Sequence, residues 1–296
     1  MLRLILDRGD VAIPSESMFL IDLDFRKPPN ELLHDAWNHP RVRLWKLPGD
    51  PPALPANLSG ADARRFALSA PFVAYAEREG KTRWGDKTPA YIGHIDRVAA
   101  IWPEARFLVL VRDGRDVALS LLKVPFGANN VWAAARSWAA AIRHGRDAAR
   151  RYPDRVLTVR YEDLVTRPAE EVPRICGFLG LEYDPDMLAI DRTDRTKVVE
   201  DQAGWFTNVW GGITTDAVGK WRRELTPHQQ QVFESVAGAE LRELGYETTG
   251  ATASPASVPA YAMHDAAMRL VNFVRLRLVQ ERGREVRQVV KRKLAR

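Results

Sequence analysis

The chain has 296 residues, of which 46% are hydrophobic and 28% are charged, so it can bury the core of one large α/β domain with appendages. It contains no apolar run of about 18 residues and no signal-peptide pattern, which argues against a transmembrane helix and predicts a cytoplasmic protein. The net charge of +6 is uneven, because residues 261–296 hold ten basic and three acidic residues. The body therefore need not bind a polyanion, and we expect no nucleic-acid partner for it.

Short apolar runs alternate with longer helical patterns, which is typical of a parallel sheet with crossover helices. A helical pattern over residues 95–102 precedes the clearest strand, 106–111, and a second helical segment covers 116–123. A long helix from about 131 to 152 leads to another strand, 155–160. These continuous apolar runs predict strands that are buried on both faces.

Residues 248–260 are mostly small and polar and include two prolines, as is typical of a linker. The sequence therefore predicts an α/β domain over 1–247, a linker over 248–260 and a tail over 261–296. Apolar residues alternate with arginines in the tail, as in a basic amphipathic helix. Docking on the body or on a second protomer is the favoured role. Contact with an anionic membrane or a nucleic acid is the alternative.

Cysteine and histidine chemistry is not indicated. Cys176 lies in a helical pattern with no partner for a disulfide, so we expect it to be buried and structural. The six histidines are scattered without metal-ligand spacing, which argues against a zinc site.

The most informative segment is RDGRD at residues 112–116. It places Arg112 at the carboxyl end of a strand and Ser120 eight residues later in the next helix, at the sheet edge where open α/β folds bind ligands. Arg112 could grip a phosphate with two hydrogen bonds, and Ser120 could close the same site. Taken alone, the string could also be a salt-bridged turn.

Four further motifs give a family resemblance. RDGRD resembles the 3′-phosphate signature of sulfotransferases that use 3′-phosphoadenosine 5′-phosphosulfate (PAPS), a family with a P-loop-NTPase-like parallel sheet. RYEDL at 160–164 and GKWRR at 219–223 resemble later elements of that family. WGDKTP at 84–89 and the stretch 9–19 resemble earlier ones.

The resemblance implies transfer of a sulfuryl group from PAPS to a hydroxyl, or less readily an amine, of a small-molecule, glycan or peptide acceptor, without a metal. Arg112 and Ser120 would hold the 3′-phosphate, assisted by Tyr161 and Lys220.

Glu16 and Lys87 are the catalytic pair that the resemblance implies. Glu16 would take the proton of the acceptor. Lys87 would stabilise the charge that develops on the oxygen leaving sulfur.

The resemblance breaks at the start of the chain. The family normally opens with a strand and a GxxRSGTT loop that holds the 5′-phosphosulfate, whereas Met1–Leu6 looks like the helix after that loop. Residues 80–82, Gly-Lys-Thr, are no substitute, because position 75, where a P-loop needs its first glycine, is Tyr75. A start codon assigned too far downstream is the favoured explanation. The alternative is a truncated, non-catalytic homologue that still binds nucleotide.

The acceptor site is only outlined by the sequence. Residues 124–138 and 191–215, the latter with Trp205, Phe206 and Trp210, are candidate walls. Aromatic rings suit a sugar or an aryl group equally, and core packing would also explain them.

Overall fold

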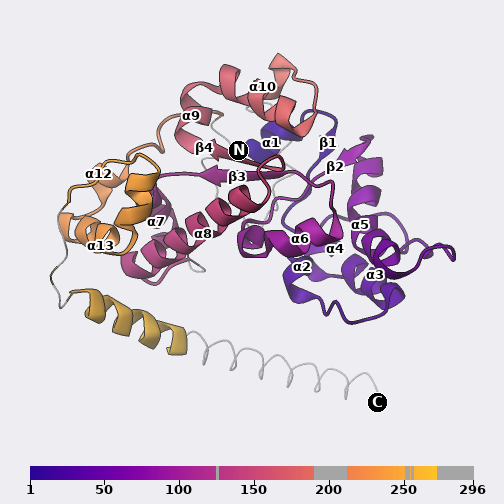
Figure 1. The fold of residues 1–296 in the computed structure, drawn as a ribbon, viewed down its shortest axis with the longest axis horizontal. Coiled ribbons are helices and arrows are strands. Elements are labelled where there is room, and N and C mark those ends of the chain that lie inside the picture. The colour runs from indigo at the N-terminus through magenta and orange to yellow at the C-terminus, as the bar shows by residue number, and fades with distance from the viewer. Residues whose placement is uncertain (125–126, 190–211, 251–253, 255–256, 272–296) are drawn as a thin grey trace, which may run out of the picture. The chain divides into compact units, whose positions relative to one another are not determined.

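The structure is a computed structural model that describes residues 1–124, 127–189, 212–250, 254 and 257–271. These residues form two compact units (Figure 1). Unit 1 comprises Met1–Arg112 and Ala141–Ala217, and unit 2 comprises Asp113–Ala140 and the described residues from Val218 onward. Among the helices that the structure describes, none has both the length and the apolar character to cross a membrane.

Unit 1 contains two parallel strand pairs. The short pair joins β1 (Val11–Ala12) to β2 (Arg83–Trp84), and the longer pair joins β3 (Phe107–Val111) to β4 (Val156–Arg160). In the longer pair Phe107 lies opposite Val156 and Val111 lies opposite Arg160, so both strands end at the same edge. Parallel pairing therefore brings the residues that follow β3 and β4 close together.

The helices of unit 1 pack into two main cores. One core lies between α1, β4, α9 and α10 and includes Ile5, Val159, Leu164 and the buried Cys176. The other gathers α2, α4 and α5 around Phe19, Phe72 and Trp45, and α3 packs alongside α5 (Figure 1). The bounds of these helices are α1 Leu2–Leu6, α2 Phe19–Asp22, α3 Pro29–Trp37, α4 Pro40–Arg43, α5 Gly60–Arg78, α6 Ile95–Ile101, α9 Tyr161–Thr166 and α10 Pro168–Leu179, with 3-10 helices η1 Pro89–His94 and η2 Pro185–Leu188.

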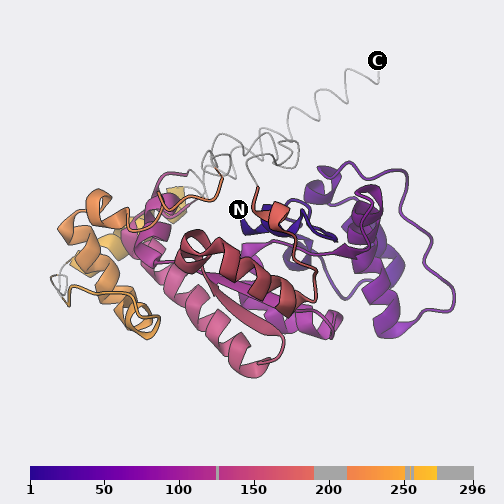
Figure 2. The ribbon, with the colours of Figure 1, turned by 90° about the horizontal axis from the view of Figure 1, so that it is seen from above.

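Unit 2 is helical in its described part. It contains α7 (Gly114–Leu122), the first half of α8 (Val131–Arg151), α12 (Trp221–Glu224), α13 (Pro227–Glu243) and a helix over 257–271, and α8 is one unbroken helix (Figure 2). The rings of Trp138 and Phe233 close over Gly114, where an added Cβ would lie 2.4 Å from the indole. Only glycine fits there, which explains the glycine of RDGRD.

Most of the predicted elements are confirmed with small shifts of their ends. The strands 106–111 and 155–160 are β3 and β4, and the long helix is α8. The burial prediction is wrong for both strands, because Leu110 of β3 is 45% exposed and Thr158 of β4 is also exposed. A two-stranded pair leaves part of its surface uncovered by the described residues, whereas the prediction assumed a wider sheet.

The C-terminal helix docks within unit 2. It begins at residue 257, inside the stretch predicted as a linker, and is described as far as residue 271. Asn130 Nδ2 donates to the Tyr261 carbonyl at 2.9 Å, and Asn129 Nδ2 donates to Asp265 Oδ1 at 2.8 Å. This part of the tail therefore contacts the start of α8 in the same unit, while residues 272–296 lie outside the described residues.

Candidate functional site

Glu16 and Lys87 contact each other, although they are 71 residues apart in sequence. Glu16 follows β1 and Lys87 follows β2, and the parallel pairing of these strands carries both residues to one edge. Lys87 Nζ lies 2.5 Å from Glu16 Oε1, and the side chains are 46% and 30% exposed, respectively. The pair is therefore bonded but open to solvent.

Asp86 and Ser17, the sequence neighbours of that pair, also meet. Ser17 is fully buried, and its hydroxyl donates to Asp86 Oδ2 at 2.5 Å. Loss of water around the carboxylate raises the pKa of Asp86 to about 6, against the lowering effect of the bonds from Ser17 and Thr88. Sequence reasoning gave neither residue a role, although Asp86 lies in WGDKTP and Ser17 in the stretch 9–19, because the motifs do not show which of their residues become buried partners.

Arg112 and Tyr161, two of the residues that the resemblance assigns to the nucleotide, meet at the carboxyl ends of β3 and β4. The guanidinium carbon of Arg112 lies 4.8 Å from the centre of the Tyr161 ring. Arg112 Nη2 donates to the Ala217 carbonyl at 2.5 Å. A half-buried guanidinium stacked on an aromatic ring is held in one orientation, which suits recognition of a phosphate.

Ser120 and Lys220 both belong to unit 2, and Asp116 connects their segments. Ser120 is exposed on α7 and donates to the Asp116 carbonyl at 3.2 Å. The Asp116 carboxylate accepts the backbone N–H groups of Gly219 at 2.7 Å and Trp221 at 2.9 Å, on either side of Lys220. Gly219 has a φ of +70°, which favours glycine. Asp116 therefore fixes the loop that carries Lys220, a role that sequence reasoning missed.

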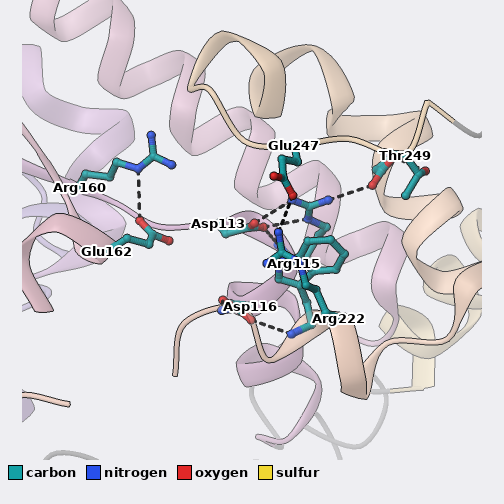
Figure 3. A network of polar contacts seen from close by, with 11 residues as sticks. Asp113, Arg115, Asp116, Arg160, Glu162, Arg222, Glu247 and Thr249 are labelled. Carbon is teal, nitrogen blue, oxygen red and sulfur yellow. Dashed lines mark hydrogen bonds and ion pairs between the residues drawn. The ribbon is translucent and has the colours of Figure 1, made fainter. Parts of the chain in front are cut away.

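Arg115 is the buried centre of a third group of charges (Figure 3). It is 1% exposed and donates to both oxygens of Asp113, at 3.0 and 2.8 Å. Its Nη1 donates to Glu234 Oε1 at 2.9 Å, and its guanidinium stacks on the Trp221 ring at 3.5 Å. The alternative interpretation of RDGRD as a salt-bridged turn thus fits Asp113 and Arg115, whereas Arg112 points elsewhere, to Tyr161.

Lys81, in the Gly-Lys-Thr string that lacks the first glycine of a P-loop, has a structural role. Its ammonium donates to the backbone carbonyls of Asp7 and Val11 and lies 3.3 Å from Asp7 Oδ1. Asp7 is 3% exposed and also accepts the N–H of Ile13. Lys81 therefore ties α1 to the start of β2 and is held by protein oxygens.

The predicted site residues fall into three groups. Glu16 with Lys87 and Arg112 with Tyr161 are contacting pairs in unit 1, and Ser120 with Lys220 are linked in unit 2 through Asp116. The candidate acceptor residues Trp205, Phe206 and Trp210 lie outside the described residues. Within the described ranges, no group of three or more His, Cys, Asp or Glu side chains is placed to hold a metal ion.

Comparisons with known proteins agree on one family. Residues 2–185 match the family model described as "Sulfotransferase family". The nodulation protein NoeE of Sinorhizobium fredii is 30% identical over 207 residues, which is 62% of this chain and 49% of NoeE. Protein-tyrosine sulfotransferase A of Caenorhabditis elegans is 28% identical over 157 residues, which is 50% of this chain and 40% of that protein. The matches thus span about half the length of these relatives or less.

Among solved structures, the sulfotransferase domain from the curacin biosynthetic pathway superposes with a TM-score of 0.55 at 19% identity. The match covers 83% of this chain and 93% of that domain. At this identity the likeness establishes the α/β fold, and it carries no information on the substrate.

Proposed function

Because the chain belongs to the sulfotransferase family, we propose that it transfers a sulfuryl group from PAPS to a hydroxyl, or to an amine, of its acceptor. The observation that carries the proposal is the 2.5 Å contact between Lys87 and Glu16. A carboxylate and an ammonium at one strand edge are suited to act as the base and as the stabiliser of the leaving oxygen in displacement at sulfur.

The proposed step is a direct, in-line displacement. A bond forms between the acceptor oxygen and sulfur while the bond from sulfur to the bridging phosphate oxygen breaks, which releases 3′,5′-ADP. Glu16 takes the proton of the acceptor hydroxyl as its oxygen becomes bonded to sulfur. Lys87 stabilises the negative charge that develops on the leaving oxygen, an interaction that is stronger in the transition state than in the ground state.

Arg112, Tyr161, Ser120 and Lys220 are the residues we assign to the nucleotide. Arg112 directly precedes Asp113, whose own carboxylate caps the N-terminus of α7 by accepting the N–H of Arg115, so we assign the phosphate contacts to side chains. The stacking of Arg112 on Tyr161 in unit 1 and the anchoring of the Lys220 loop by Asp116 in unit 2 each support a side chain held ready for phosphate. Cations and hydroxyls of these kinds are suitable partners for the 3′-phosphate of the donor.

Calorimetry with 3′,5′-ADP tests the nucleotide assignment. We expect the chain to bind 3′,5′-ADP and to bind 5′-AMP, which lacks the 3′-phosphate, at least tenfold more weakly. Equal affinity for the two nucleotides would show that the protein does not recognise the 3′-phosphate. A form extended upstream by coding sequence, measured in parallel, tests whether a further phosphate loop precedes residue 1.

A transfer assay with labelled PAPS tests the activity. Peptide tyrosine, an oligosaccharide and a simple phenol together represent the proposed hydroxyl acceptors, and the first is suggested by the name of the Caenorhabditis elegans relative. Label in any acceptor supports the enzyme. Binding of 3′,5′-ADP without PAPS turnover in either form would favour a non-catalytic homologue.

A further inference from the structure

The Asp86 carboxylate accepts hydrogen bonds from both of the segments that carry Glu16 and Lys87. Asp86 directly precedes Lys87, and Ser17 directly follows Glu16. Asp86 Oδ2 accepts from the Ser17 hydroxyl at 2.5 Å, and Oδ1 accepts from the Thr88 hydroxyl at 2.9 Å. Each oxygen of this carboxylate therefore accepts a hydrogen bond from the hydroxyl of a residue next in sequence to Glu16 or Lys87.

The direction of every hydrogen bond in this group follows from the ionised carboxylate. Because an ionised Asp86 can only accept hydrogen bonds, the Ser17 hydroxyl donates its hydrogen to Asp86. The Ser17 oxygen therefore accepts a hydrogen bond from the Tyr91 hydroxyl at 2.8 Å. The Tyr91 oxygen in turn accepts the backbone N–H of Leu20 at 3.1 Å. One chain of hydrogen bonds thus runs from the Leu20 N–H through Tyr91 and Ser17. A second chain runs from the N–H of Ser17, which donates to the Thr88 hydroxyl at 3.2 Å.

Both chains end on Asp86. We name Ser17, Asp86, Thr88 and Tyr91 the Asp86 clamp. A protonated acid or an amide at position 86 would present a donor where an acceptor is needed, so only the carboxylate satisfies every member.

The contact between Glu16 and Lys87 cannot itself hold the two segments together during the reaction. In the proposed step the base faces the acceptor and the ammonium faces the leaving oxygen, so the side chains must part to admit the sulfuryl group. Their exposure allows this, whereas Ser17, Thr88 and Tyr91 are buried. The β1–β2 pairing joins the segments four residues before Glu16 and three before Lys87, and a connection beside the pair itself must remain closed when the ion pair opens.

We propose that Asp86 is a positioning residue that keeps the backbones of Glu16 and Lys87 at a fixed separation while their side chains part. The proposal rests on the proposed function, and it assigns Asp86 no contact with the substrate. Because reacting groups displaced by about 1 Å can lose a hundredfold in rate, a loosened clamp should lower kcat and leave donor affinity intact.

The test is the substitution Asp86→Asn, which keeps the size of the side chain and turns one acceptor into a donor. We expect kcat for transfer to fall by about tenfold to a hundredfold while the Kd for 3′,5′-ADP changes less than about twofold. Asp35→Asn is the matched control, because it breaks the partly exposed Lys27–Asp35 pair in the same unit. It should leave both quantities unchanged.

A second readout does not need activity. An amine-reactive reagent modifies Lys87 at a rate that mass spectrometry can follow relative to the exposed Lys46. A loosened clamp should raise the relative rate at Lys87 severalfold in Asp86→Asn and leave it unchanged in Asp35→Asn. If wild type transfers no sulfuryl group, the proposed function fails, and the labelling still decides whether Asp86 holds Lys87 in place.

Unchanged kcat together with unchanged Lys87 labelling would overturn the proposal. An equal loss of kcat and of 3′,5′-ADP affinity would also overturn it, because that result indicates general loss of structure. If Asp86→Asn does not fold, Tyr91→Phe removes one hydroxyl from the clamp and keeps the ring. The same two changes are then expected at smaller size, and their absence would contradict the proposal.

Discussion

The charges around Arg115 and the charges at Glu16 and Lys87 share residue types but differ in their surroundings. Arg115 is 1% exposed, and three hydrogen bonds to Asp113 and Glu234 satisfy it from two sides. Lys87 has an ion-pair contact with Glu16 and is 46% exposed. The first group is closed to a ligand, whereas the second can exchange its partner for one.

Burial and partners therefore sort the charges of this chain into structural and functional ones more reliably than motif membership does. RDGRD shows the division within five residues, since Arg112 stacks on Tyr161 while Arg115 stacks on Trp221. The two arginines of one motif thus serve different purposes, and removing each should have a different consequence.

The largest expected effect is on stability. Arg115→Met leaves the carboxylates of Asp113 and Glu234 buried without their cation, which should lower the free energy of unfolding by about 3–5 kcal/mol. Urea denaturation measures the loss. Arg222→Met is the matched control, because Arg222 stacks on the same Trp221 ring but is 54% exposed, and its pair with Glu247 should contribute about 1 kcal/mol or less. Equal losses would contradict the division.

Lys87→Ala should produce the opposite result. The ammonium is exposed and its removal leaves Glu16 solvated, so the urea midpoint should hardly move. The rate of transfer should fall by about a hundredfold to a thousandfold, as for loss of one group that stabilises a leaving oxygen. Lys27→Ala serves as the control for loss of a lysine from a partly exposed pair. A full rate in Lys87→Ala would remove Lys87 from the mechanism.

Arg112→Ala should affect binding. Loss of a charge-assisted bond to phosphate is expected to weaken 3′,5′-ADP binding by about tenfold to a hundredfold, with 5′-AMP affected less. Arg160→Ala removes a neighbouring arginine that pairs with Glu162 at 3.7 Å, and it should bind 3′,5′-ADP as wild type does. If calorimetry gives the same loss of 3′,5′-ADP affinity for both variants, the loss reflects the lower positive charge of the protein and not a contact made by Arg112.

The pKa of Asp86 predicts a smaller, pH-dependent effect. Its value of about 6 exceeds the ordinary 3.8, mainly through desolvation, while Lys87 lowers it and Glu16 raises it. The folded state therefore holds this proton more tightly than the unfolded state between about pH 4 and 6. The contribution of Asp86 to stability falls as the pH rises through that window and is constant above it.

Urea midpoints measured across the same window check this prediction. The difference in stability between wild type and Asp86→Asn should shift against wild type from about pH 4 to 6 and then level off. Parallel curves would show that the carboxyl has an ordinary pKa in the folded protein.

The sequence was sufficient for the strands and helices around RDGRD, whereas α3, α5 and α13 were not predicted. Apolar periodicity located β3, β4 and α8. The contact between Arg112 and Tyr161 became evident only in the structure, where parallel pairing brings the two strand ends together. The roles of Glu16 and Lys87 came from the family resemblance, because β1 and β2 have two residues each and carry no periodic signal.

The supporting residues could not be predicted. Asp86, Asp116 and Arg115 are charged residues in polar segments, a pattern that indicates exposed turns, and only tertiary packing decides that Arg115 is buried. The exposure of Leu110 was missed for the same reason, since an apolar run does not reveal how many strands flank it.

The most direct test of the catalytic pair is the release of labelled sulfate from PAPS to water, which needs no knowledge of the acceptor. Wild type should release sulfate and 3′,5′-ADP in equal amounts. Lys87→Ala should be slower by about a hundredfold or more, while it still binds 3′,5′-ADP. Equal rates for wild type and Lys87→Ala, at saturating PAPS, would contradict the account that places sulfuryl transfer at the Glu16–Lys87 contact.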